Sequence, residues 1–189
     1  MPSKAPAART LPAKTRILRA AMLLFARTPF SETSLRDIAA EAQVDVAYVH
    51  RAFGSKAEIF RQALKAASPL DDLFAQPADP DTVLERLCER AFTRDPDCVE
   101  DVEMLHLAMQ SCSCSEARSI LEDLIRTEIA RPLADVFGHK DTGRAMLATS
   151  FLNGVITMRL LFGSESMRNM PKDQMKALLV AALRGVMSG

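Results

Sequence analysis

Apolar positions recur with helical spacing along most of the chain, and the stretch between residues 33 and 60 is the most informative. One face of a first helix, at i, i+3, i+4 and i+7, is formed by Leu35, Ile38, Ala39 and Ala42. Ser34 stands three residues before Asp37, which is a capping pattern that starts a helix. A break at Gln43 is followed by Asp45, a favoured N-cap residue. The pattern therefore predicts a helix, a short turn and a second helix.

The second helix of this pair has two different faces. Val49 and Phe53 lie one turn apart on its inner face. Its outward side and flanks carry Ala47, Tyr48, His50 and Arg51. A polar, aromatic and cationic face is typical of a recognition helix that enters the major groove of DNA. An ordinary helical hairpin with a solvated outer face has the same spacing, so the spacing alone leaves both interpretations open.

The flanking sequence extends this pattern over residues 14–64. The upstream helix carries Ile17, Leu18, Ala21, Leu24 and Phe25. Thr-Ser-Leu-Arg-Asp-Ile-Ala begins at Thr33, and Phe-Gly-Ser-Lys begins at Phe53 and opens a fourth helix. Together these motifs closely resemble the DNA-binding domain of the TetR family of transcriptional regulators. The resemblance covers about a third of the chain.

The resemblance implies an all-α protein of about nine helices. It places a flexible arm at residues 1–12, a three-helix helix-turn-helix domain at 13–67 that includes a linking fourth helix at 55–67, and a helical dimerisation and effector-binding domain at 80–189. It implies double-stranded operator DNA, a second copy of the chain and an unknown small-molecule effector as partners. The DNA contacts that it implies are Thr33, Ser34, Val46, Ala47, Tyr48, His50, Arg51 and Lys56.

Three positions depart from the usual family pattern. Pro29 and Phe30 replace a common Gly-Tyr, and Gln43 stands where glycine often makes the turn. Gln43 must therefore tolerate the backbone geometry of that turn. His50 occupies the place of the usual tyrosine of the recognition helix, so the usual contact between that tyrosine and a phosphate does not carry over directly.

Charge is unevenly distributed although the whole chain is neutral. Residues 1–67 carry 11 Lys and Arg against 5 Asp and Glu, a balance of +6, and the remainder carries 13 against 19, a balance of −6. A basic module beside an acidic remainder fits a phosphate-binding head joined to a body that does not bind DNA. We expect a cytoplasmic protein, because the N-terminus has no apolar signal sequence and residues 145–162 are too polar to span a membrane.

The last two helices predict an assembly surface. Wide apolar faces are predicted at Phe151, Val155, Met158 and Phe162, and after Pro171 at Met175, Leu179, Ala182 and Val186. In the TetR family the helices at these places form the homodimer interface, and the resemblance implies the same here. The alternative is that both faces pack only within one chain.

The sequence offers little for catalysis. It contains no phosphate-binding loop, metalloprotease motif or nucleophile elbow, so we expect neither an enzyme nor a bound metal or cofactor. Cys112 and Cys114 are a weak candidate for a thiol sensor or a soft-metal site. A stripe of small polar residues suggests an effector pocket, with Met109, Met146, Ser150, Asn153 and Thr157 as the lining residues. The alternative is that this stripe allows close packing between helices.

These features favour a sequence-specific DNA-binding transcriptional regulator, expected to be a repressor that a small-molecule effector releases from its operator. The alternative is a small-molecule-binding or interaction protein whose head no longer binds DNA specifically. The departures at Gln43 and His50 keep that alternative open.

Overall fold

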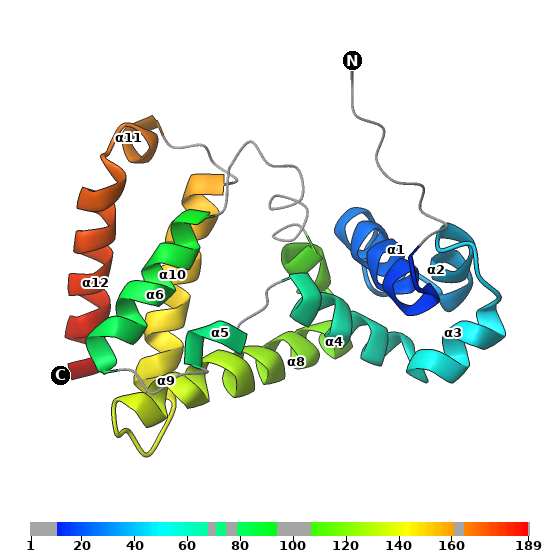
Figure 1. Cartoon of the computed structure of the whole chain (residues 1–189), viewed down its shortest axis with the longest axis horizontal. Helices are drawn as coiled ribbons and strands as arrows, with labels where there is room; N and C mark the ends of the chain where they lie inside the picture. Colours follow the sequence, from blue (N-terminus) through cyan, green and yellow to red (C-terminus); the bar gives the residue numbers. More distant parts are fainter. Residues whose placement is uncertain (1–10, 68–70, 75–78, 94–106, 161–164, 189) are drawn as a thin grey trace. The chain divides into compact units, whose positions relative to one another are not determined.

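The computed structural model describes residues 11–67, 71–74, 79–93, 107–160 and 165–188 (Figure 1). Every regular element within these ranges is helical, which confirms the all-α prediction. The chain divides into two compact units. Unit 1 comprises Met1–Ser68 and His106–Ile120, and unit 2 comprises Pro69–Leu105 and Leu121–Gly189.

Unit 1 contains the helices predicted around the turn. They are α1 (Ala13–Arg27), α2 (Leu35–Glu41), α3 (Val46–Phe53) and α4 (Lys56–Ala67), together with the first half of α8 (Ser115–Ile125). Helix α1 packs against α4 and α2, and α2 packs against α3. Ser55 caps the start of α4, because the Glu58 N–H donates to the Ser55 hydroxyl over 3.1 Å.

Three phenylalanines form the centre of the unit 1 core. Phe25, Phe30 and Phe60 are at most 1% exposed. The Phe25 and Phe60 ring centroids are 5.0 Å apart in an edge-on arrangement, as are those of Phe30 and Phe60, and Phe25 stacks on Phe30 at 5.7 Å. Edge-on and offset aromatic pairs stabilise a core beyond the area they bury. Phe30, one of the departures from the family pattern, is thus a core residue that fixes the loop before α2.

The turn between α2 and α3 uses a left-handed backbone conformation at Gln43, whose φ is 53°. The Gln43 N–H donates to the Ala40 carbonyl over 3.1 Å, and the Val44 N–H donates to the Ala39 carbonyl over 3.0 Å. These two bonds satisfy carbonyls at the end of α2 that the helix itself leaves free. Glycine adopts this conformation without strain, whereas Gln43 does not.

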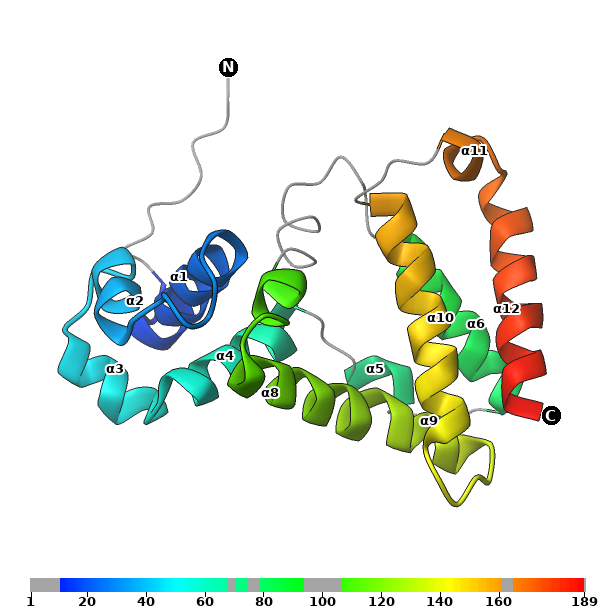
Figure 2. The same cartoon turned by 180° about the vertical axis from the view of Figure 1, so that it is seen from behind.

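Unit 2 is a helical bundle built around α6 (Pro80–Thr93), α10 (Gly143–Leu160) and α12 (Lys172–Ser188). Both views show these three helices side by side, with α6 on one side of α10 and α12 (Figure 1, Figure 2). The shorter elements are α5 (Asp71–Phe74), η2 (Arg126–Ala130), α9 (Arg131–Val136) and α11 (Glu165–Arg168). The apolar core lies between the long helices and includes Leu84, Leu133 and Leu183, each at most 1% exposed.

Helix α8 runs into η2 and α9 with helical backbone angles at Ile125, Ala130 and Arg131. The Arg131 N–H donates to the Arg126 carbonyl five residues earlier, which makes η2 a π-helical turn. Pro132 lies in the first turn of α9, where a missing N–H costs little. Pro132 therefore follows directly after a π turn, and the helical path continues through it into α9.

Ion pairs join α6 to α12. The Glu89 carboxylate accepts hydrogen bonds from Lys176 Nζ at 2.7 Å and Lys172 Nζ at 3.4 Å. These bonds, Lys176 first, hold the pKa of Glu89 below its usual value, and the bond to Glu89 raises the pKa of Lys176. Arg184 donates to Asp81 over 2.8 Å. The acidic side of α6 is thus matched to the basic side of α12.

Candidate nucleic-acid interface

Helix α2 begins with a complete capping box. The Ser34 hydroxyl accepts a hydrogen bond from the Asp37 N–H at 3.2 Å, and the Ser34 N–H donates to Asp37 Oδ2 at 2.8 Å. The Ser34 hydroxyl also lies 2.6 Å from Asp37 Oδ2, and this bond, with the backbone bond, lowers the pKa of Asp37. Both residues are exposed, so the start of α2 is held rigidly at the surface of unit 1.

Helix α3 presents the outer face that its sequence predicts. Asp45 caps it by accepting the Ala47 N–H at 2.6 Å. Val49 and Phe53 are buried on its inner side. Among the other predicted positions, three are exposed, namely Ala47, His50 and Arg51. The remaining two, Val46 and Tyr48, are half-buried.

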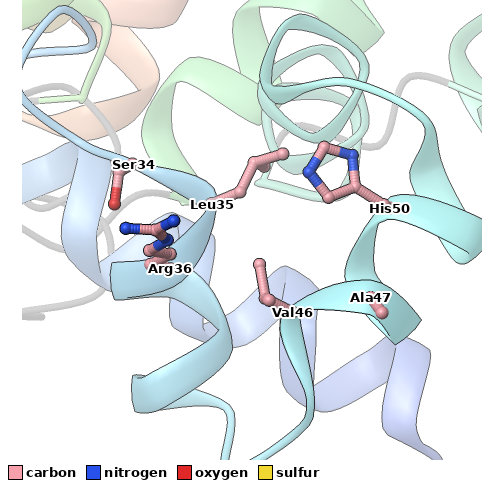
Figure 3. A pocket seen from close by; sticks show the side chains of 6 residues that line it. All are labelled: Ser34, Leu35, Arg36, Val46, Ala47 and His50. Carbon is pink, nitrogen blue, oxygen red and sulfur yellow. The ribbon is translucent and has the colours of Figure 1, made fainter.

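The starts of α2 and α3 border an open cleft of about 530 Å³ (Figure 3). In Figure 3, Leu35 and His50 point toward one another from the two helices, and Val46 points into the space between them. The other lining residues are Ser34, Arg36 and Ala47. Arg36 is exposed on α2 and is absent from the predicted DNA contacts, although a cation two residues after the N-cap Ser34, in the first turn of α2, is a usable signal.

Besides Ser34, two further predicted DNA contacts have partners within the chain. Thr33 is 3% exposed, and its hydroxyl donates to the Pro29 carbonyl at 3.2 Å. Thr33 therefore fixes the loop and offers little surface to a ligand. Lys56 Nζ donates to the Phe30 carbonyl at 2.6 Å and lies 4.2 Å above the centre of the Phe30 ring. Its ammonium therefore joins α4 to the loop before α2.

The residues predicted to line an effector pocket are divided between the two units. Met109 belongs to unit 1 and is 51% exposed, whereas the other four belong to unit 2. Ser150 and Asn153 are exposed on α10. The hydroxyls of Ser150 and Thr157 donate back to the carbonyls of Met146 and Asn153 over 2.8 Å. The hydroxyl groups of two of the four side chains in unit 2 thus form hydrogen bonds within their own helix.

The predicted dimer residues divide between surface and core. On α10, Phe151 and Met158 are exposed and Val155 is half-buried, while Phe162 lies outside the described residues. On α12, Met175 and Leu179 are buried in the core of unit 2, Val186 is half-buried and Ala182 is exposed. The free apolar surface of α12 is instead centred on Leu178, which is 57% exposed. The exposed apolar face of α12 therefore differs in direction from the predicted face, because Met175 and Leu179 of the predicted face pack against the core of unit 2.

Among the described residues, no group of three or more His, Cys, Asp or Glu side chains is placed to hold a metal ion. Within the same part of the chain, no helix combines the length and apolar character needed to cross a membrane.

Several solved structures share this fold. GusR of Salmonella enterica has a TM-score of 0.70 and 19% identity, over 95% of this chain and 97% of GusR. NalD, the secondary repressor of the MexAB-OprM multidrug efflux pump in Pseudomonas aeruginosa, has a TM-score of 0.66 and 22% identity, over 90% and 93% of the two chains. A TetR-family regulator from Streptomyces coelicolor A3 has a TM-score of 0.54 and 24% identity over the full length of both chains. At these identities the likeness shows the fold.

Family models assign both parts of the sequence. Residues 17–63 match the model of bacterial regulatory proteins of the tetR family, and residues 81–187 match the tetracyclin repressor-like C-terminal domain. No curated protein matches the chain significantly. The first match covers the helices that form the exposed α2 and α3 surface, and the second covers more than half of the chain. The chain therefore belongs to the tetR family of bacterial regulatory proteins and is a DNA-binding transcriptional regulator.

Proposed function

We propose that this regulator is a homodimeric repressor that binds a two-fold operator through α2 and α3 and is released by a small-molecule effector. The observation that supports this proposal is the outer face of α3, which presents Ala47, His50 and Arg51 to solvent beside the capped start of α2. The DNA of a bacterium lies in the cytoplasm, so we propose the same location for the protein.

In the proposed complex, α3 enters the major groove and its exposed residues contact base edges and phosphates. Arg51 suits a bidentate contact to guanine, because its guanidinium carries parallel N–H donors. Arg36, on the rim of the cleft, would bind a phosphate, while Ser34, whose N–H and hydroxyl both donate to Asp37, would hold the start of α2 in place beside it. The half-buried Val46 and Tyr48 would contribute apolar and edge contacts, while Lys56 and Thr33 hold the loop that positions α2.

Apolar exposure on α10 and α12 supports the homodimer. Leu147, Phe151 and Met158 of α10 are 60%, 45% and 47% exposed. On α12 the exposed Leu178 is accompanied by small exposed residues, Ala181, Ala182 and Gly185. Small residues let a partner helix approach closely, and several large apolar side chains in water favour association. A dimer also fits DNA recognition, because two heads about 34–36 Å apart reach successive major grooves.

The effector is proposed to bind unit 2. Met146, Met167 and Met170 are partly buried against the core of that unit. Methionine side chains adapt to irregular apolar ligands, so we expect an apolar or amphipathic organic molecule. Such a ligand would release DNA by binding more tightly to a conformation whose two heads no longer match the operator spacing.

Binding of the purified protein to genomic fragments tests the proposal. Once a fragment is found, Arg51→Ala is expected to cost about 1–3 kcal/mol at one base position, measured with operators substituted base by base. Arg118→Ala on α8 removes the same charge from another exposed position and serves as the control. An equal loss on all sequences would make Arg51 a phosphate contact. Failure of every fragment to bind would favour the alternative, an interaction protein without specific DNA binding.

A further inference from the structure

Two cysteines lie at the corner where the chain enters α8. The Cys112 N–H donates to the Met109 carbonyl at 3.2 Å, and the Cys114 N–H donates to the Ser111 carbonyl at 3.1 Å, so two tight turns follow one another. The Cys114 carbonyl accepts the Arg118 N–H at 2.9 Å, which makes Cys114 the residue from which α8 starts. Cys112 Sγ lies 3.2 Å from the Ala108 carbonyl oxygen. Main-chain bonds therefore hold both cysteines in a compact arrangement.

This arrangement suits a ligand that bonds to both sulfurs. Consecutive Cα atoms are about 3.8 Å apart, so the Cα atoms of two cysteines separated by one residue in a turn lie roughly 5–6 Å apart, a separation that one arsenic or mercury atom bonded to both sulfurs can span. Cys112 is exposed and Cys114 is half-buried, so a reagent reaches both. No third His, Cys, Asp or Glu completes a metal-binding group with them among the described residues. The pair therefore suits a ligand that needs only two sulfurs.

Cys88 provides a contrast within the same chain. Cys88 is buried in the core of unit 2, and this burial raises its pKa to about 11. A thiol of this kind reacts slowly, because the thiolate is the nucleophile. Cys98 lies outside the described residues.

We propose that Cys112 and Cys114 form a binding site for thiophilic ligands, namely trivalent arsenic compounds or soft two-coordinate metal ions. An arsenic(III) oxide condenses with the two thiols, so that two As–S bonds form and the oxygen leaves as water with both thiol protons. A mercuric ion forms two Hg–S bonds and displaces two protons into solution. Neither reaction changes an oxidation state, so neither needs an oxidant.

The position of the pair connects such binding to the head. The segment that carries both cysteines belongs to unit 1, the unit that contains α1 to α4. Leu107, Ser111 and Ala117 are fully or almost fully buried on either side of the pair. Bridging the sulfurs alters a turn between these buried anchors and thereby changes how the segment packs within unit 1. This regulatory effect rests on the proposed function, whereas the binding site itself does not.

The binding site is tested without DNA. The full chain with Cys98→Ser is treated with phenylarsine oxide or mercuric chloride in the presence of excess monothiol, and native mass spectrometry measures the bound ligand. One phenylarsenic group or one mercury per chain is expected. Cys112→Ser or Cys114→Ser should each weaken binding about 100-fold, because the second bond then becomes intermolecular. Cys88→Ala should leave binding unchanged. Equal binding by the single-serine variants would overturn the site.

The regulatory effect is tested with the operator found for the untreated protein. We expect phenylarsine oxide or mercuric ion to lower operator affinity at least tenfold in the protein that retains both cysteines, and to leave the two serine variants unaffected. Stoichiometric binding with unchanged operator affinity would overturn the regulatory effect while leaving the site in place. An untreated protein that binds no DNA would overturn the proposed function, and mass spectrometry would still decide the binding site.

Discussion

Replacing Gln43 by glycine is expected to stabilise unit 1. Gln43 holds a φ of 53° in the turn between α2 and α3. A residue with a Cβ pays about 1–2 kcal/mol for a left-handed conformation. Glycine avoids that cost but loses about 0.5–1 kcal/mol of additional backbone entropy on folding. The difference predicts a net gain of about 0.5–1 kcal/mol for Gln43→Gly.

The contacts around Gln43 allow this gain to be measured cleanly. The hydrogen bonds of the turn use the main-chain atoms of Ala39, Ala40 and Val44, and Arg16 donates to the Gln43 carbonyl at 3.5 Å. Glycine keeps all of these atoms. The Gln43 side chain is exposed, so its removal leaves no cavity. Gln43→Ala is the matched control, because it shortens the side chain but retains the Cβ that causes the strain.

Urea denaturation followed by tyrosine fluorescence provides the assay. Tyr48 is the only tyrosine and the chain has no tryptophan, so the signal reports on α3 and therefore on unit 1. For an m value of about 2 kcal/mol/M, the expected gain raises the urea midpoint by about 0.3–0.5 M with m unchanged. The alanine control should stay within about 0.5 kcal/mol of the original protein. A glycine variant less stable than the alanine variant would refute the strain argument.

Three further predictions concern other parts of the chain. Lys56→Met should lower the stability of unit 1 by about 1–2 kcal/mol in the same assay, since it leaves the Phe30 carbonyl without its donor, and unchanged stability would contradict the proposed joint. Phe151→Glu combined with Leu178→Glu should give helical monomers with weakened operator binding in sedimentation and anisotropy measurements, and a stable dimer would disprove the proposed interface. The hydrogen bonds from Lys176 and Lys172 lower the pKa of Glu89, so the contribution of these bonds to stability is present above pH 4.5, the ordinary pKa of a glutamate, and is lost as the pH falls below that value. Glu89→Gln should remove this pH dependence in melts followed by circular dichroism. An unchanged acid profile would contradict the argument.

Local sequence signals located most of unit 1. Ser34 and Asp37 cap α2 as predicted, and Ser55 caps α4 with the same spacing to Glu58, because a cap needs only residues three positions apart. The pair Ser113 and Glu116 has the same spacing but does not cap α8. The Ser113 hydroxyl donates back to the Gln110 carbonyl at 3.0 Å, and α8 begins at Ser115. The spacing of a capping pair therefore does not by itself decide whether the serine bonds forward to α8 or back to the residues before it.

Periodicity was less informative about the bundle of unit 2. Helix α10 is apolar on two opposite sides, with Leu152 and Ile156 in the core and Leu147 and Phe151 in solvent. Spacing identifies apolar positions but does not say which of them face their own core. For the same reason, spacing alone predicts that Leu179 contacts a second copy of the chain, although Leu179 lies in the core of unit 2. Within the candidate site, the contact between Lys56 and Phe30 joins residues 26 positions apart, and no local pattern predicts such a contact.

The exposed apolar surface of α10 and α12, which includes Phe151 and Leu178, affects how steeply promoter activity would depend on the concentration of this protein. If only paired chains hold both half-sites, then while single chains predominate the concentration of the binding species follows the square of the total chain concentration. Halving the chain concentration, for example by proteolysis, would then cut operator occupancy to about a quarter at low saturation. A surface with no role in reading DNA would thus set the steepness of the genetic response.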